Sequence, residues 1–244
     1  MARRGAKVTL HGRNQANLDA VKEEIVQVTD ISSDVISVTG DVTDAAVREK
    51  IVSETLDAFG QIDILVNNAG DIEYNIPLLQ VTRDNLNANF DLLLHAPIHL
   101  SQLCHPHLAK TKGNLVNISS IAATAIFPGI FSYSCAKTSL NIFTGYAAAE
   151  FGKDGIRVNS ISPGPIKTPL FERERPGYPN GAGELLQAGA AMSALGIYGE
   201  AEDVAEIVAF YASDAARLIT GDNNINDAGI SLPFLFKGPQ CKDS

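Results

Sequence analysis

The chain has 244 residues, of which 45% are hydrophobic and 19% are charged. This apolar content excludes a disordered chain, and the length fits a single α/β domain over residues 1–244. The formal net charge of −9 and the lack of a basic block in the sequence exclude an extended nucleic-acid-binding surface.

Short apolar segments typical of strands alternate with longer segments typical of helices. The predicted strands are 8–10, 35–38, 62–66, 115–118, 156–160 and 223–226. The predicted helices are about 14–28, 43–59, 86–108, 133–151, 183–194 and 201–213. We expect Thr43 or Asp44 to cap the second helix and Gly60 to end it. The alternation predicts an α/β fold, a doubly wound parallel sheet with helices on both faces.

Polar residues and glycines follow most of the predicted strands directly. These clusters are 12–13, 40–41, 67–70, 119–120 and 163–168. Because ligands of such sheets bind outside the carboxyl ends of the strands, the clusters predict one ligand cleft at that edge.

Tyr133 and Lys137 lie four residues apart on a predicted helix, so their side chains share one face. An unperturbed tyrosine has a pKa of about 10, and a nearby ammonium group lowers it. Such a tyrosine can act as a general acid or base. Ser120 follows the preceding strand, where its hydroxyl can hydrogen-bond a substrate oxygen as charge develops there.

At these spacings the chain resembles the short-chain dehydrogenase/reductase family over about residues 5–229. The segments that carry the resemblance are Asn67-Asn68-Ala69-Gly70, Asn117-Ile118-Ser119-Ser120, Tyr133 with Lys137, residues 157–164 and Thr168. The resemblance implies a Rossmann-like fold and a nicotinamide-dependent oxidoreductase acting on a small alcohol or carbonyl substrate.

The resemblance also implies catalytic roles. Tyr133 is the expected general acid/base, Lys137 the residue that lowers its pKa and holds the nicotinamide ribose, and Ser120 the residue that orients the substrate oxygen. Asn89 matches a helix asparagine that supports a proton-relay water, and Asn87 is a competing candidate.

Cofactor contacts are implied for a further set of residues. They are Arg13, Asp41, Val42, Asn68, Ala69, Gly70, Tyr133, Lys137, Pro163, Gly164, Ile166 and Thr168. Asp41 and Val42 are expected against the adenine, although Asp41 would serve equally as a helix cap. Gly12 stands where members that prefer NAD usually carry an acidic residue, and Arg13 is suited to a 2′-phosphate. NADP(H) is therefore favoured over NAD(H).

One departure from the family lies ahead of Val8, where no apolar strand and no Gly-rich pyrophosphate loop precede it. That strand would lie centrally, between the predicted strands 8–10 and 62–66. Without it, two inner sheet edges would carry unpaired backbone groups, each costing about 1–3 kcal/mol when buried. We therefore expect a sheet that lacks its first central strand, in a chain truncated at its N-terminus relative to the family.

A second functional interpretation stays open beside the enzyme. Such a chain could be an inactive interaction protein with little cofactor affinity that oligomerises through helices 86–108 and 133–151. For either function the resemblance implies a homodimer or homotetramer. The segment 171–183, rich in Pro, Gly and charge, is expected to be a mobile loop over the substrate.

The remaining expectations concern metals and location. His95 and His99 have a spacing that metals use, but the surrounding helix is Leu-rich and no carboxylate set accompanies them, so no metal is expected. Three unpatterned cysteines favour a reducing compartment. Without a signal-like or membrane-spanning apolar run in the sequence, we expect a cytoplasmic protein with no membrane partner.

Overall fold

The computed structural model describes residues 1–29, 34–172 and 181–232. The strands are β1 (Val8–Gly12), β2 (Val35–Thr39), β3 (Ile64–Asn67), β4 (Asn114–Ile118), β5 (Arg157–Pro163), β6 (Ile166–Lys167), β7 (Gly199–Glu200) and β8 (Asn223–Asn226). The α-helices are α1 (Gln15–Thr29), α2 (Ala45–Phe59), α3 (Arg83–Phe90), α4 (Ala96–Thr111), α5 (Phe131–Phe151), α6 (Pro169–Glu172), α7 (Gly183–Met192) and α8 (Ala201–Tyr211). Short 3-10 turns lie at Ala2–Arg4, Leu78–Gln80, Ile121–Ala123, Gly152–Asp154 and Asp214–Ala216, and a π turn at Asp91–His95.

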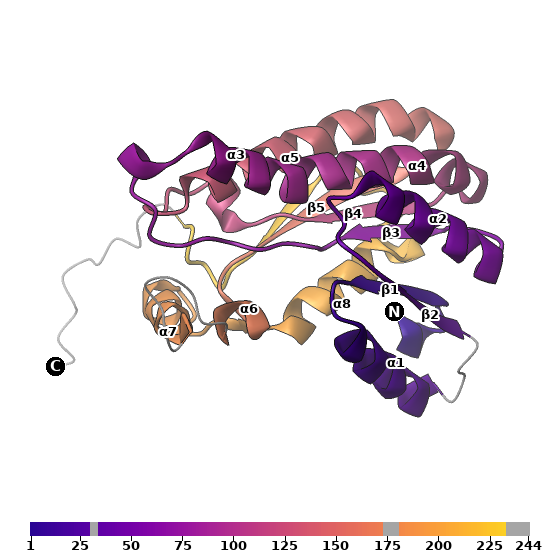
Figure 1. The fold of residues 1–244 in the computed structure, drawn as a ribbon, viewed down its shortest axis with the longest axis horizontal. Helices are drawn as coiled ribbons and strands as arrows, with labels where there is room; N and C mark the ends of the chain where they lie inside the picture. Colours follow the sequence, from indigo (N-terminus) through magenta and orange to yellow (C-terminus); the bar gives the residue numbers. More distant parts are fainter. Residues whose placement is uncertain (30–33, 173–180, 233–244) are drawn as a thin grey trace, which may run out of the picture.

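Every strand pairing in these ranges is parallel. The largest sheet has the order β3-β4-β5-β8, while β1 pairs with β2 and β6 with β7. Figure 1 shows α2, α4 and α5 over one side of the strands and α8 on the other. The α/β architecture expected from the alternation of strands and helices is confirmed.

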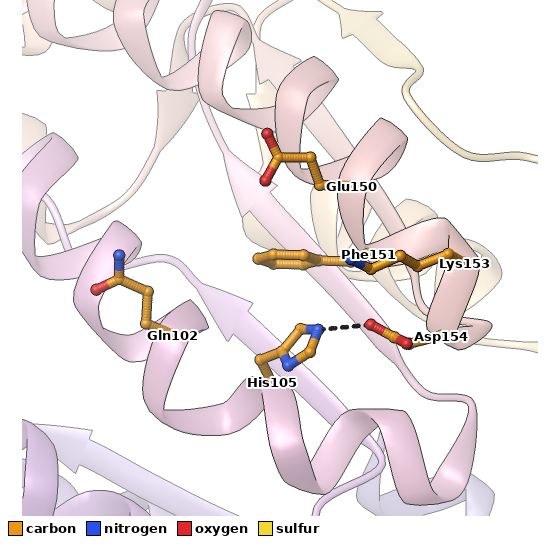
Figure 2. Close-up of a pocket in the computed structure, with 6 residues that line it drawn as sticks. All are labelled: Gln102, His105, Glu150, Phe151, Lys153 and Asp154. Atoms are coloured by element: carbon orange, nitrogen blue, oxygen red, sulfur yellow. Dashed lines mark hydrogen bonds and ion pairs between the residues drawn. The ribbon is translucent and has the colours of Figure 1, made fainter.

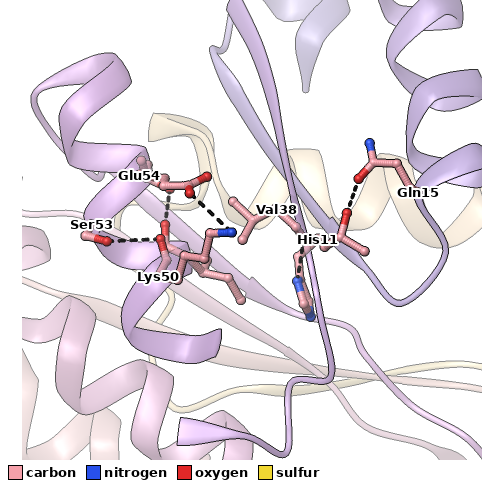
Figure 3. A network of polar contacts seen from close by, with 9 residues as sticks. His11, Gln15, Val38, Lys50, Ser53 and Glu54 are labelled. Atoms are coloured by element: carbon pink, nitrogen blue, oxygen red, sulfur yellow. Dashed lines mark hydrogen bonds and ion pairs between the residues drawn. The ribbon is translucent and has the colours of Figure 1, made fainter. Parts of the chain in front are cut away.

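The strands β1 and β3 do not pair with each other within the described ranges. The expected discontinuity between these two strands is thus present, and each leaves one edge outside the ladders. All five residues of β1 are only half-buried, and Val66 in β3 is 36% exposed. His11 holds β1 to β2 through a 2.9 Å contact between its Nδ1 and the Val38 carbonyl (Figure 3). The hydroxyls of Thr9 and Thr55 lie 2.8 Å apart and join β1 to α2.

The core divides between the two faces of the large sheet because side chains alternate along β4. Leu115 belongs to the cluster beneath α2, α4 and α5, whereas Val116 packs with Val208 and Tyr211 of α8. Both β4 residues are fully buried. This packing on two faces fixes the position of β4 between the helices. It therefore also fixes the position of the residues that follow the carboxyl end of β4.

Local signals placed the ends of α2 correctly. The Asp44 side chain accepts a hydrogen bond from the Ala46 N–H, and Gly60 adopts a left-handed φ of 77° while its N–H bonds the Leu56 carbonyl. The predicted strand 62–66 in fact starts at Ile64, although Ile62 is buried.

The predicted helix 86–108 is longer and less regular than expected. It runs from Arg83 to Thr111 as α3, the π turn and α4. Pro97, which has no N–H to donate, stands just after the π turn and removes a donor from the regular pattern. None of the described helices combines the length and the apolar character that crossing a bilayer requires.

Candidate active site

Ser120 and Tyr133 meet just beyond the carboxyl end of β4. Ser120 precedes the turn Ile121–Ala123 and accepts a 3.1 Å hydrogen bond from the Ala122 N–H through its Oγ. The Ser120 side chain also hydrogen-bonds the Tyr133 hydroxyl. Two residues 13 positions apart in the sequence therefore present their oxygens to the same small region.

The Tyr133 phenol stays protonated in this arrangement. Burial raises its pKa above the ordinary value, and the hydrogen bond with Ser120 opposes that rise only in part. From the spacing of Tyr133 and Lys137 we expected a lowered pKa for Tyr133, whereas burial raises it. The reason is that burial disfavours the phenolate more strongly than neighbouring groups favour it.

Lys137 lies one helical turn from Tyr133 and is only 4% exposed. Its Nζ donates a 2.6 Å hydrogen bond to the Ile118 carbonyl and lies 5.7 Å from the centre of the Tyr133 ring. Burial lowers the pKa of this ammonium group to about 8. Ser120, Tyr133 and Lys137 are therefore brought together as the sequence predicted, at the edge formed by the end of β4.

Asn89 and Asn87, the two candidates for the proton-relay asparagine, differ clearly in burial. Asn87 is exposed, whereas Asn89 is buried and donates from Nδ2 to the Asn85 carbonyl at 2.9 Å. Asn89 lines a cavity of about 10 Å³ together with Tyr133. The other residues that line it are Glu73, Ile76, Val81, Gly129, Ile130, Phe131 and Ser132. Of the two candidates, only Asn89 is both buried and a lining residue of a cavity shared with the phenol.

Charged residues gather where β1, β2 and β3 end. Hydrogen bonds from the Thr43 N–H and hydroxyl hold the pKa of Asp41 below its ordinary value, and the nearby Arg13 and His11 lower it further. The Arg13 Nη2 lies 3.9 Å from Asp71 Oδ2. Arg13 thus stands between carboxylates that follow β2 and β3, at the edge where the sequence predicted the nucleotide end of a ligand.

Val42, expected with Asp41 against the adenine, has its side chain in the core. Its side chain is 5% exposed and packs in the core cluster beneath α2 and α4. Its carbonyl accepts a 2.6 Å hydrogen bond from Arg48 Nη1. The turn at 41–44 can therefore offer a ligand its backbone and the exposed Asp41, but not the Val42 side chain.

The residues after β3 divide into one structural and three exposed positions. Asn67 is buried and donates from Nδ2 to Asn117 Oδ1 at 2.9 Å. Asn68, Ala69 and Gly70 are exposed at the carboxyl end of β3. These three residues are therefore accessible to a ligand.

The segment after β5 is fixed by its neighbours on β8. Pro163 is the last residue of β5 and pairs with Asn226, and the Gly164 N–H bonds the Asn226 carbonyl at 2.9 Å. A Cβ at Gly164 would lie 2.9 Å from Asp227 Cα, so only glycine fits without a shift. Ile166 lies in β6, and the half-buried Thr168 donates from Oγ1 to the Ile166 carbonyl at 3.3 Å.

Residues 173–180 of the expected substrate loop 171–183 lie outside the described residues, while Phe171 and Glu172 end α6 and Gly183 begins α7. His95 Nδ1 lies 2.8 Å from Asp91 Oδ1, and His99 Nδ1 accepts from Arg48 Nε.

A larger hollow of about 310 Å³ lies apart from this site, between α4 and α5 (Figure 2). Its residues are Gln102, His105, Glu150, Phe151, Lys153 and Asp154. His105 Nε2 lies 3.0 Å from Asp154 Oδ2, and the His105 and Phe151 rings are 4.6 Å apart. None of the sequence-predicted site residues lines this hollow.

Comparisons with known proteins bear on the whole chain. A family model described as enoyl-(acyl carrier protein) reductase matches residues 1–231. Dehydrogenase/reductase SDR family member 4 of Caenorhabditis elegans is 34% identical over 227 residues, which is 93% of this chain and 86% of that protein.

Two solved structures extend the comparison to the fold. A short-chain dehydrogenase/reductase of unknown function from Caenorhabditis elegans, crystallised with cofactor, matches with a TM-score of 0.84 and 32% identity, covering 96% of this chain and 89% of that one. L-sorbose reductase from Gluconobacter frateurii, in complex with NADPH and L-sorbose, matches with a TM-score of 0.86 and 25% identity, covering 96% and 90%.

Proposed function

The chain belongs to the short-chain dehydrogenase/reductase family, and we propose that it transfers a hydride between NADP(H) and a small alcohol or carbonyl substrate. The observation that carries the proposal is the hydrogen bond between the Ser120 and Tyr133 side chains, with the buried Lys137 one helical turn away. This arrangement places a proton donor and an orienting hydroxyl beside each other at the carboxyl edge of a parallel sheet.

The residues present fit the nicotinamide end of such a cofactor. A glycine is required at position 164 by the approach of Asp227, and Asn68, Ala69 and Gly70 offer exposed backbone at the carboxyl end of β3. We propose that these residues, with Pro163, Ile166 and Thr168, hold that end. Cofactor affinity is the measurement on which the proposal depends.

Proton transfer is the part of the reaction that this chain's own residues perform. The bound nicotinamide would supply or accept the hydride. In the direction of reduction, Tyr133 gives its proton to the carbonyl oxygen, and its raised pKa keeps that proton in place beforehand. Ser120 donates a hydrogen bond to the same oxygen as negative charge develops there. Lys137 provides a positive charge near the resulting phenolate, and Asn89 supports water in the adjoining cavity.

A preference for NADP(H) follows from the charges near the end of β1. The Arg13 side chain is 62% exposed and lies close to Asp41, whose position we assign to the adenine side. A guanidinium group binds a phosphate by paired hydrogen bonds, so Arg13 would favour a nucleotide with a 2′-phosphate.

We further propose a homodimer or homotetramer formed through α4 and α5. On α5, Ile142 and Tyr146 are 60% and 68% exposed and lie four residues apart on one face. The free Cys104 and Cys135 are consistent with a reducing, cytoplasmic location.

The test uses the Tyr133→Phe variant and titration with both cofactors. We expect the wild-type chain to bind NADPH more tightly than NADH and to turn over a carbonyl substrate found by screening. The variant should lose turnover by about 100-fold or more while its NADPH dissociation constant stays nearly unchanged, because only the proton donor is removed. Unchanged turnover in the variant would refute the assigned mechanism. A wild-type oligomer that binds neither cofactor would instead favour the non-enzymatic interaction protein.

A further inference from the structure

Arg48 of α2 is buried in a way that requires explanation. The residue is 9% exposed, and both of its recorded partners in the described ranges are acceptors without negative charge. Nη1 donates to the Val42 carbonyl at 2.6 Å, and Nε donates to His99 Nδ1 at 2.8 Å. A buried guanidinium group without a carboxylate partner is costly, which sets Arg48 apart from an ordinary core residue.

The two partners of Arg48 belong to different parts of the molecule. Val42 lies in the turn that follows β2, next to Asp41, and His99 lies on α4 just beyond the π turn. Because a guanidinium group is planar and rigid, its two hydrogen bonds fix the distance between turn and helix. The Val42 side chain anchors the same turn in the core from below.

We infer that Arg48 is a positioning residue for cofactor binding. It holds the turn 41–44 in the position in which the turn can contact the adenine end of the cofactor. The inference rests on the proposed function, since it assumes that a dinucleotide occupies the carboxyl edge. Arg48 acts through the Val42 carbonyl and touches no reacting atom. Without it, the turn keeps its own local hydrogen bonds, from Thr43 to Asp41 and from Ala46 to Asp44, but loses its tie to α4.

The chain offers a matched control in Arg157. That residue is half-buried and, like Arg48, donates to two distant acceptors, the carbonyls of Ile219 at 3.5 Å and Ser213 at 3.2 Å. It stands at the first residue of β5, at the opposite end of that strand from Pro163 and Gly164. Its loss removes a comparable set of contacts far from the turn 41–44.

The experiment compares Arg48→Met, Arg48→Lys and Arg157→Met in the full chain, with NADPH as the titrant. We expect Arg48→Met to raise the NADPH dissociation constant about tenfold, the factor that corresponds to one hydrogen bond of about 1.4 kcal/mol. The KM for NADPH should rise more than kcat falls. Arg48→Lys should recover most of the affinity, because an ammonium group can still reach the Val42 carbonyl. Arg157→Met should leave NADPH affinity within about twofold of the wild type, even where it lowers the unfolding midpoint.

Hydrogen exchange separates failure of this inference from failure of the proposed function. The amides of residues 42–44 should exchange faster in Arg48→Met than in Arg157→Met, with no cofactor present. Faster exchange at the turn together with unchanged NADPH affinity would overturn the positioning role and leave the proposed function intact. Equal exchange in the two variants would overturn it as well. A wild type that binds no dinucleotide would overturn both, since no cofactor would remain to be positioned.

Discussion

Lys137 keeps a charge in a place where burial makes charge costly. Its folded-state pKa is lowered to about 8, against an ordinary value of 10.5. Between these two pH values the unfolded chain binds more protons than the folded one, so the stability of the folded state rises with pH. Burying the charged Lys137 side chain lowers the free energy of unfolding. This destabilisation is present in full below about pH 8 and disappears as the pH approaches 10.5.

The Lys137→Met variant makes this cost measurable, because methionine does not titrate. We expect the free energy of unfolding of the wild type, relative to the variant, to increase by about 3 kcal/mol as the pH rises from 7 to 10.5. Denaturant unfolding at several pH values measures it. Replacing the exposed Lys153 by Met should give a curve parallel to that of the wild type. A relative stability of Lys137→Met that does not change with pH would mean that the lysine is not desolvated.

At the scale of the elements, a buried polar network joins β3, β4 and α5 directly behind the site. Asn117 is fully buried, accepts from Asn67 Nδ2 at 2.9 Å and donates from its own Nδ2 to Thr144 Oγ1 at 2.9 Å. Thr144 in turn donates to the Leu140 carbonyl. The network fixes the positions of β3, β4 and α5 relative to one another. It therefore also fixes the relative positions of Asn68, Ser120 and Tyr133, which these elements carry.

Replacing Asn117 by Ala should lower the free energy of unfolding by about 2 to 3 kcal/mol, because Asn67 loses its principal acceptor and a small void forms. Asn114 in the same strand is the matched control. It is 2% exposed, and its side-chain nitrogen and oxygen have no hydrogen-bond partner among the described residues. Asn114→Ala should therefore cost clearly less. Equal losses in the two variants would show that volume, not hydrogen bonding, determines the stability of β4.

What could be predicted from the sequence depends on how far apart the interacting residues lie in the chain. The ends of α2 were predicted correctly because a capping aspartate and a left-handed glycine act within a few residues. Ser120, Tyr133 and Lys137 were brought together as predicted, since one strand end and one helix face carry them. The contact of Arg48 with His99 spans 51 positions and has no local signal. The pKa of Tyr133 was predicted in the wrong direction, because burial is set by packing across the whole fold.

For the whole molecule, the division between β1-β2 and the four-stranded sheet predicts unequal local stability. Every residue of β1 is half-buried and α1 buries only Leu18, whereas four of the five residues of β4 are buried between β3 and β5. Local opening is easiest where few apolar contacts are lost, so the N-terminal pair of strands should open without the rest.

Amide hydrogen exchange tests this directly. We expect the amides of β1 and β2 to exchange about tenfold or more faster than those of β4 and β5. The edge strand β8 serves as the internal control, because among the described residues it also pairs on one side only but joins the four-stranded sheet. If an edge position alone caused the difference, β8 would exchange as fast as β1. Exchange in β1 as slow as in β4 would mean that the two sheets open as one unit, joined more strongly than by the contact of Thr9 with α2.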